Sequence, residues 1–317
     1  MLARSLRYAR RSFLAAAALL LSGVDMPSLA SASHEDGPVR QEVQQFLQKL
    51  ASDGIPPYIL RPALAAVQRH LPTSLLKEMQ NLAQAAFVSF HDLFAYNALE
   101  GLPLSAAFLS TYLPQSLVFV VPREGQQAGL MGAALLSANG PTTWQVSESF
   151  QGLMIGTRLG LHLGISGGTM LATLAEPAAP WLGPGVPTTL AARLCLQRGH
   201  SPKAALRTLT ELQASRRSRY LLYDPVEATA QLAEVGDARR ADDLSTPLTV
   251  LIAPEAETGA NMAYLREALA ANLGWLTAEK ALRLLQRAAP DATCVVLNAD
   301  ERTGVLVSAS HRQEISF

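Results

Sequence analysis

Residues 164–168 read Gly-Ile-Ser-Gly-Gly and match the Gly-x-Ser-x-Gly pattern of serine hydrolases. In such enzymes a sharp turn between a strand and a helix pushes the serine hydroxyl out of the sheet. The apolar stretches 159–165 and 170–174 can supply the strand and the helix on either side of Ser166. The pattern predicts a serine esterase, although glycine-rich turns that contain serine are also common outside active sites.

A catalytic triad around Ser166 needs a later acid and a later histidine. Asp224 or Asp242 can be the acid, and His311 can be the base. His311 lies six residues from the C-terminus, with no predicted strand after it to hold its ring. The sequence also has no His-Gly-Gly-Gly run of the kind that forms the oxyanion hole in many esterases. The esterase therefore remains one of three hypotheses for function.

Metal and cofactor chemistry find no support in the spacing of the residues. The six histidines are scattered, no His, Cys and Asp cluster has the spacing of metal ligands, and no glycine-rich phosphate loop occurs. We therefore expect no cofactor and no metal. Cys195 falls in an apolar helical pattern and Cys294 opens a Val-Val-Leu strand, so both are expected to be buried small hydrophobic residues.

A second set of residues, spread over the first third of the chain, carries a family resemblance. These residues are Leu71-Pro72, Glu78, Asn81-Leu82-Ala83, Val88-Ser89, Asp92-Leu93, Asn97-Ala98-Leu99 and Leu104-Ser105-Ala106-Ala107-Phe108. In this order they resemble the penicillin acyltransferase-like family, a branch of the N-terminal-nucleophile hydrolases. The stretches 150–163, 188–212, 220–235 and 294–308 look like later parts of the same family.

The resemblance implies a fold and a chemistry. The fold would be an α+β, four-layer αββα sandwich, and the activity would be cleavage or transfer of a small amide-linked acyl group. After autocleavage, one residue serves as nucleophile and its own free amine serves as base. Aligned on Phe108, the nucleophile position falls on Ser105, so the Leu104–Ser105 peptide would be cut. Arg158 takes the place of an asparagine that assists at the oxyanion.

Two departures from the family pattern support a different outcome. The segment that follows the nucleophile in the family is missing, because only eight residues separate Phe108 from the strand that starts at Leu117. Arg158 brings a permanent planar cation where the family has an amide. The third hypothesis is therefore a catalytically inactive relative that acts as a binding or interaction protein.

The elements that must position these residues follow from hydrophobic periodicity and breakers. They predict a helical N-terminal segment over residues 33–104. The family resemblance implies that residues 105–317 form the αββα hydrolase-like domain. The helices are expected near 43–50, from Pro62, from Pro72, 89–98, 188–197, 202–212, 261–272 and 277–288. The strands are expected at 117–121, 130–137, 144–150, 153–157, 159–166, 220–223, 229–235, 248–252, 294–297 and 305–308. The run 216–219, Arg-Arg-Ser-Arg, is interpreted as a solvated helix end.

The first 32 residues predict export. Four arginines precede a short apolar run, and Ala30-Ser31-Ala32 offers a small-residue cleavage site. Arg10-Arg11, followed by Ser-Phe-Leu, resembles the twin-arginine address, with an ordinary secretory signal as the alternative. The apolar run is too short for a membrane-spanning helix, which needs about 20 residues. We expect a periplasmic or secreted protein without a stable membrane anchor.

The charge balance excludes one class of partner. The chain has 26 basic and 26 acidic residues, and removal of the leader leaves a slight acidic excess. No basic stripe or long charge run is present, so nucleic acid is not an expected partner. A small amide or acyl compound is the expected partner, by way of the family resemblance.

Overall fold

The computed structural model describes residues 37–136, 142–174, 176, 178–199, 201–236, 240–252, 261–308 and 311–317. The predicted leader, residues 1–32, lies outside this range. No helix among the described residues is long and apolar enough to cross a membrane.

Amphipathic helices form the first part of the described chain. They are α2 (Pro38–Ser52), α3 (Pro57–Gln68), α4 (Thr73–Ala85), α5 (Phe90–Ala98), the 3-10 turn η2 (Leu99–Gly101) and the short α6 (Ala106–Leu109). Ser89 caps α5 as its capping-box sequence predicts, because its hydroxyl accepts the backbone N–H of Asp92. One expectation is wrong: Pro62 lies inside α3, and Pro57 takes the first helical position, where a missing N–H costs nothing.

Two antiparallel sheets follow. The first has the strand order β10-β1-β2-β11-β12-β13, and the second runs from β3 to β9 in sequence order. The strands of the first sheet are β1 (Gln115–Val121), β2 (Leu130–Leu136), β10 (Thr249–Ile252), β11 (Thr293–Asn298), β12 (Thr303–Val307) and β13 (Arg312–Ser316). Those of the second are β3 (Thr142–Val146), β4 (Gln151–Ile155), β5 (Leu163–Ser166), β6 (Thr169–Leu174), β7 (Ser218–Asp224), β8 (Thr229–Val235) and β9 (Arg240–Leu244).

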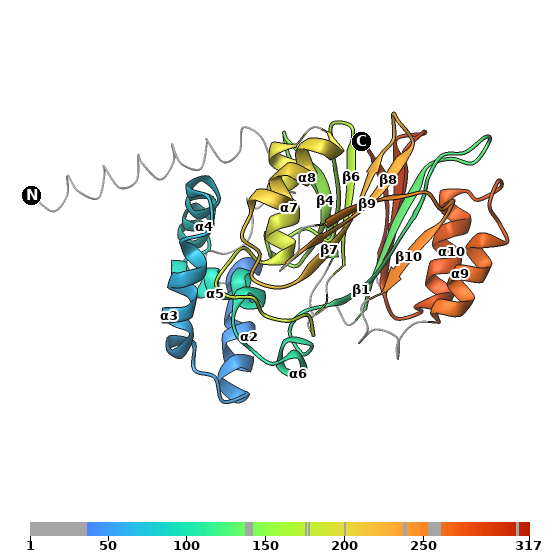
Figure 1. Ribbon diagram of the computed structural model, residues 1–317. Helices are drawn as coiled ribbons and strands as arrows, with labels where there is room; N and C mark the ends of the chain where they lie inside the picture. The colour runs from blue at the N-terminus through green and yellow to red at the C-terminus, as the bar shows by residue number, and fades with distance from the viewer. Residues whose placement is uncertain are drawn as a thin grey trace, which may run out of the picture.

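The sheets stack face to face, and each is covered on its outer side by helices (Figure 1). Alternate residues of both sheets, such as Val118, Val295, Leu163 and Leu221, form the core between them. Helices α9 (Met262–Ala270) and α10 (Ala278–Ala288) pack on the other face of the first sheet. Helices α7 (Thr188–Arg198) and α8 (Pro202–Glu211) pack on the other face of the second. The predicted α+β, αββα architecture is confirmed.

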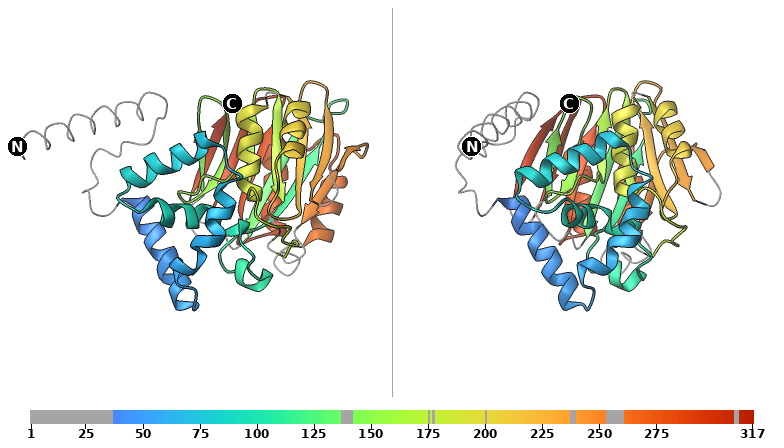
Figure 2. Two further views of the ribbon diagram at one scale, coloured as in Figure 1. Left: turned by 60° about the vertical axis from the view of Figure 1, so that its left-hand side comes forward. Right: turned by 90° about the vertical axis from the view of Figure 1, so that its left-hand side faces the viewer.

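The N-terminal helices share a core with the second sheet's helix layer. Side chains of α2, α3, α4 and α5 belong to the same buried cluster as those of α7 and α8. Figure 2 shows these N-terminal helices against the α7 and α8 side of the sandwich, away from α9 and α10. The helical segment therefore extends one outer layer.

Besides β6, whose residues were expected to form a helix, the two edge strands β9 and β13 were not predicted from the sequence. They read Arg-Ala-Asp-Asp-Leu and Arg-Gln-Glu-Ile-Ser, and each forms the outer edge of its sheet. Edge strands often carry charged residues because these discourage pairing with other chains. The charge that protects these strands also removes the apolar alternation by which a strand is predicted.

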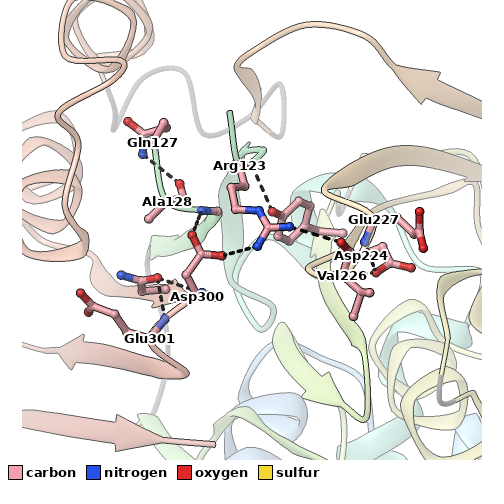
Figure 3. Close-up of polar contacts among 11 residues, drawn as sticks. Arg123, Gln127, Ala128, Asp224, Val226, Glu227, Asp300 and Glu301 are labelled. Carbon is pink, nitrogen blue, oxygen red and sulfur yellow. Dashed lines mark hydrogen bonds and ion pairs between the residues drawn. The ribbon is translucent and has the colours of Figure 1, made fainter. Parts of the chain in front are cut away.

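A polar cluster joins the two sheets where β1 ends (Figure 3). The backbone N–H of Arg123 donates to the Tyr223 hydroxyl at 3.1 Å, and its guanidinium donates to the Val226 carbonyl at 3.3 Å. The same guanidinium lies 3.7 Å from Asp300 of the β11–β12 turn. A side chain at Gly129 would overlap the Tyr223 hydroxyl, so the β1–β2 hairpin needs glycine there. The turns of both sheets are thus fixed at this end.

Candidate functional site

A small, largely enclosed polar cavity lies at the opposite end of the sandwich, just before β1. It is lined by the polar side chains Asn97, Glu100, Arg158, His162, Glu176 and Thr189, together with Leu113, Pro114 and Gly160. Its volume is about 20 Å³. A cavity of this size holds about one water molecule. The site is polar but closed to any larger molecule in this conformation.

Arg158 reaches the cavity from the turn between β4 and β5. Its Nη2 donates to the Tyr112 carbonyl at 3.2 Å, and its guanidinium lies 4.7 Å from the centroid of the Tyr96 ring. Its Nε atom is buried without a hydrogen-bond partner among the described residues. Arg158 was predicted to be a site residue, and the structure places it on the wall of the polar cavity.

The N-terminal helices hold the turn that carries Arg158. Glu42 of α2 accepts the Thr157 backbone N–H at 2.8 Å and the Tyr96 hydroxyl at 2.8 Å. Burial raises the pKa of Tyr96 to about 12, so this phenol stays a neutral donor. Gly156 has a φ of +56°, and a side chain there would overlap the Glu42 carboxylate. Glycine is therefore required for the turn to approach α2.

The residues after Arg158 are anchored by two buried polar groups. Asn97 accepts the Leu159 backbone N–H at 2.7 Å, and its own amide donates to the Leu93 carbonyl at 2.9 Å. Arg193 of α7 donates to the Leu159 carbonyl at 3.2 Å and pairs with Glu78 of α4 at 2.6 Å. These bonds join three elements, α4, α5 and α7, to one turn. Arg158 is therefore positioned rigidly.

His162 is buried beside the cavity with 4% of its surface exposed. Its Nδ1 atom has no hydrogen-bond partner among the described residues. Desolvation by burial, with a smaller contribution from the nearby Arg158 cation, lowers the pKa of His162 to about 3. The ring is therefore neutral at physiological pH, and it can accept or donate one hydrogen bond at Nδ1.

Glu100 brings the only acidic side chain that is more than nine-tenths buried among the described residues. Burial raises the pKa of its carboxyl group, while hydrogen bonds from Thr188 and Thr189 act in the opposite direction. The Thr189 backbone N–H donates to Glu100 Oε2 at 3.4 Å. This N–H belongs to the first turn of α7, where the helix dipole favours a negative charge. One of the free N–H groups of that turn is therefore bonded to a residue of the chain itself.

Arg216 overturns the interpretation of 216–219 as a solvated helix end. Only 3% of Arg216 is exposed, and the residues that follow form β7. Its guanidinium donates to the carbonyl groups of Ala179 at 2.7 Å, and of Glu100, Leu102 and Leu104 at 2.9 Å. A cluster of basic residues predicts a solvent-exposed segment. The buried guanidinium of Arg216 is instead satisfied by four backbone carbonyl groups, one of which, that of Leu102, also accepts the Leu104 backbone N–H.

Ser105 lies on the surface as the N-cap of α6. Its hydroxyl accepts the Phe108 backbone N–H at 3.2 Å, which is the ordinary role of a capping serine. Ser105 is exposed and is not among the residues that line the cavity with Arg158. The carbonyl of Leu104, on the other side of the predicted cleavage point, accepts a bond from Arg216. The structure thus brings the two predicted catalytic residues to different places.

Ser166 does not sit on a nucleophile elbow. The residues after it form β6, which pairs with β5 in a hairpin around Gly167, so the predicted helix at 170–174 is wrong. The hydroxyl of Ser166 donates a hydrogen bond to the backbone carbonyl of Ser149 at 2.6 Å. Met170 and Leu171 are in fact completely buried strand residues. Apolar content alone could not distinguish a strand from a helix over five residues.

The predicted partners of Ser166 do not complete a triad. His311 is exposed before β13, a strand that the sequence did not predict. At the other end of β13, Phe317 lines the same surface pocket as Ser166. The strand rise places His311 about 20 Å from that pocket. Asp224 accepts the backbone N–H groups of Val226 and Glu227 in the β7–β8 turn (Figure 3). Asp224 and His311 therefore do not line the pocket of Ser166, and the three residues do not form a triad in this structure.

The remaining predictions about reactive groups concern the cysteines and metals. Cys195 and Cys294 are free and buried, as predicted. Burial raises the pKa of Cys294 to about 12 and also raises that of Cys195, so neither forms a thiolate at neutral pH. Within the described ranges, no three His, Cys, Asp or Glu side chains are grouped as a metal site requires. Asp242, the alternative acid, lies on the edge strand β9.

Sequence reasoning missed Glu100, His162 and Glu176. A signal for the first two was present, because each is a single titratable residue inside an apolar run. Glu100 follows Asn-Ala-Leu and precedes Gly-Leu, while His162 lies between two leucines. A lone polar residue in such a run is buried with the run, and burial perturbs its pKa.

Comparisons with known proteins give a similarity in structure but none in sequence. No protein-family model matches the sequence, that of the penicillin acyltransferase-like family included, and no curated protein matches it. Among solved structures, the chain is similar to a Caenorhabditis elegans N-acylethanolamine-hydrolyzing acid amidase (NAAA) ortholog. The two share 11% sequence identity with a TM-score of 0.46, over 58% of this chain and 92% of that chain.

Proposed function

We propose that this protein is a non-catalytic binding protein built on an αββα sandwich of the amide-hydrolase type. The observation that carries the proposal is the separation of the two residues that catalysis would require together. Ser105 caps a surface helix, and Arg158 lines a closed interior cavity. The N-terminal-nucleophile chemistry needs the nucleophile and the oxyanion partner within about 3 Å of one reacting carbonyl.

The cavity itself supports a role in binding. Its lining contains no serine and no cysteine, and its one hydroxyl residue is Thr189. The Thr189 backbone is already engaged with Glu100. Nearly every polar group around Arg158 is fixed by an internal hydrogen bond, as the bonds of Asn97 and Glu42 show. A rigid set of positioned donors suits recognition of a polar ligand.

A second candidate function is the self-processing amidase, which one contact favours. Arg216 Nη2 donates to the Leu104 carbonyl at 2.9 Å, and this carbonyl belongs to the peptide that autocleavage would break. A guanidinium at that position would stabilise the oxyanion formed when the Ser105 hydroxyl attacks the carbonyl carbon. In the binding-protein proposal, the same contact only clamps the 100–104 segment.

Intact-mass measurement of the purified protein decides between the two. The binding-protein proposal predicts one chain with no cut at Leu104–Ser105, and no stoichiometric labelling of Ser105 by an acylating probe. The proposal would be overturned if the wild type gave two fragments, one ending at Leu104 and one beginning at Ser105, while Ser105→Ala stayed as one uncut chain.

A matched variant separates the chemical role of Ser105 from its capping role. Ser89 is also an N-cap, with its hydroxyl accepting the Asp92 N–H at 3.1 Å. If Ser105 is only a cap, Ser105→Ala and Ser89→Ala should each lower the free energy of unfolding by about 1 kcal/mol. Neither change should then alter the binding of any ligand.

Export remains part of the proposal. We propose that the leader over residues 1–32 directs the chain to the periplasm or outside the cell, through the pair Arg10-Arg11. The same mass measurement on exported protein reads the cleavage site, which is expected after Ala32. Replacing both arginines by lysine should stop export by the twin-arginine route, and an unchanged level of exported protein would indicate the ordinary secretory route.

A further inference from the structure

A groove lies next to the cavity, on the other side of Glu176. It has a volume of about 300 Å³ and is lined by Glu176, Arg217, Arg219 and Glu234, together with the apolar stretch 178–180. This volume is at the lower end of the range for small-molecule sites. Because Glu176 lines both the groove and the cavity, its side chain forms part of the wall between them.

An ion pair between Arg219 and Glu176 helps to hold this wall. Arg219 Nε donates to Glu176 Oε1 at 2.6 Å, and Arg219 Nη2 contacts the same oxygen. Both side chains are mostly buried, with 24% of Arg219 and 13% of Glu176 exposed. A guanidinium binds any carboxylate in the same two-pronged way. A ligand carboxylate can therefore take the place of the Glu176 carboxylate on Arg219.

On the cavity side, two nitrogen atoms need a partner. Arg158 and His162 both line the cavity. Their Nε and Nδ1 atoms, respectively, are buried and have no hydrogen-bond partner among the described residues. Arg158 Nε can only donate, and His162 Nδ1 donates in one tautomer of the neutral ring. An oxygen atom that accepts hydrogen bonds can satisfy a donor of this kind. A buried donor left without a partner costs about 1–3 kcal/mol, which a suitable ligand would recover.

We propose that the cavity and the groove together bind a small molecule that carries a carboxylate next to an amide or ester carbonyl. The carboxylate pairs with Arg219 after Glu176 turns aside, and the carbonyl oxygen reaches Arg158 and His162. The rest of the ligand lies against the apolar stretch 178–180. This assignment rests on the proposed binding function and names the class of ligand for it.

The test uses two ligands that differ only in charge, N-acetylglycine and N-acetylglycinamide, titrated into the full mature chain by calorimetry. Wild type should bind N-acetylglycine at least tenfold more tightly than the amide, because only the acid pairs with Arg219. Arg219→Gln should remove this preference. Glu176→Gln, which weakens the competing internal partner, should tighten the binding of N-acetylglycine severalfold.

Further variants separate the two halves of the site. Arg158→Lys keeps the charge but removes the Nε–H donor, so it should weaken both ligands by a similar factor. Arg207→Gln is the control, because Arg207 forms only an exposed pair with Glu211 on α8, and binding should not change. Circular dichroism melts of each variant establish that it is folded.

The outcomes are distinguishable from those that test the proposed function. The proposed site would be overturned if neither wild type nor Glu176→Gln bound N-acetylglycine saturably, or if wild type bound the acid and the amide equally well. Neither result would contradict the proposal that the protein is non-catalytic. Release of acetate from N-acetylglycine, followed by NMR in the same samples, would instead overturn the non-catalytic function while leaving the site in place.

Discussion

The buried His162 makes a quantitative prediction about acid stability. Its pKa is lowered from 6.5 to about 3 in the folded protein, chiefly because burial disfavours the charged ring. Between these two values the unfolded chain binds a proton at this position and the folded chain does not. The free energy of unfolding therefore decreases as the pH falls below about 6.5, and this contribution levels off near pH 3.

The size of this loss in the free energy of unfolding follows from the difference between the pH and the pKa of histidine in the unfolded chain. Each pH unit below 6.5 costs about 1.4 kcal/mol, so His162 alone should cost about 2 kcal/mol at pH 5 and almost nothing at pH 7.5. His162→Gln removes the titrating group but keeps a polar side chain that can hydrogen-bond toward Arg158. The variant can be less stable by a constant amount at every pH, because the packing of the cavity changes.

Urea unfolding at pH 7.5, 6.0 and 5.0 measures this effect. The difference in free energy of unfolding between wild type and His162→Gln should shift by about 2 kcal/mol between pH 7.5 and 5.0 in favour of the variant. Glu100, whose pKa is raised by burial, contributes with the opposite sign, but it is present in both proteins and cancels in the difference. His91→Gln, at an exposed position, is the control. Parallel curves for wild type and His162→Gln would refute the reasoning.

Three further predictions concern the surroundings of the site. Arg216→Met should lower the free energy of unfolding by about 3–5 kcal/mol in urea titrations, because the carbonyl groups of Glu100, Ala179 and Leu104 lose their donor. A loss below about 1 kcal/mol would contradict this. Gly156→Ala should lower the free energy of unfolding more than Gly125→Ala. Both glycines have a φ near +57°, but only a Cβ atom at residue 156 would overlap a carboxylate, that of Glu42. Equal losses would show that backbone strain alone matters. Cys195 and Cys294 should react with a disulfide reagent only after denaturation, and rapid labelling of the native protein would show that the buried positions open.

Local sequence signals predicted helices and strands correctly where the conformation of a segment depends only on the residues within it. The capping box at Ser89, the helical period of α4 and the β-branched run of β1 depend on neighbouring residues. The failures arise where a distant segment decides. Pro62 is tolerated inside α3, and β6 is a strand because β5 and β7 pair with it on both sides. A segment of five apolar residues carries no local information about which neighbours it will have.

The site shows the same division more sharply. Arg158 was predicted, but the contacts that position its turn come from Glu42, which is 115 residues away from Thr157 along the chain. The clamp of Arg216 on the Leu104 carbonyl spans 112 residues. No spacing rule connects residues at such distances, so a run of arginines was interpreted as solvated. Three-dimensional structure was needed to show which charge is buried and by which groups it is satisfied.

The polar site also bears on what cleavage at Leu104–Ser105 would do to the molecule. Asn97 and Glu100 come from the helical segment, whereas Arg158, His162 and Thr189 come from the domain that follows. The predicted boundary at residue 104 therefore passes through one site and one hydrophobic cluster, because α2 to α5 share their core with α7 and α8.

A cut at this peptide would leave the two pieces associated. The helical segment on its own would expose the buried faces of four helices, and the larger piece would lose the groups that fix Arg158. Both costs oppose dissociation. If the chain does process itself, the two fragments should elute together in size-exclusion chromatography and separate only in denaturant. Fragments that separate under native conditions would show that the shared core contributes little, and would contradict the four-layer arrangement with its extended helical layer.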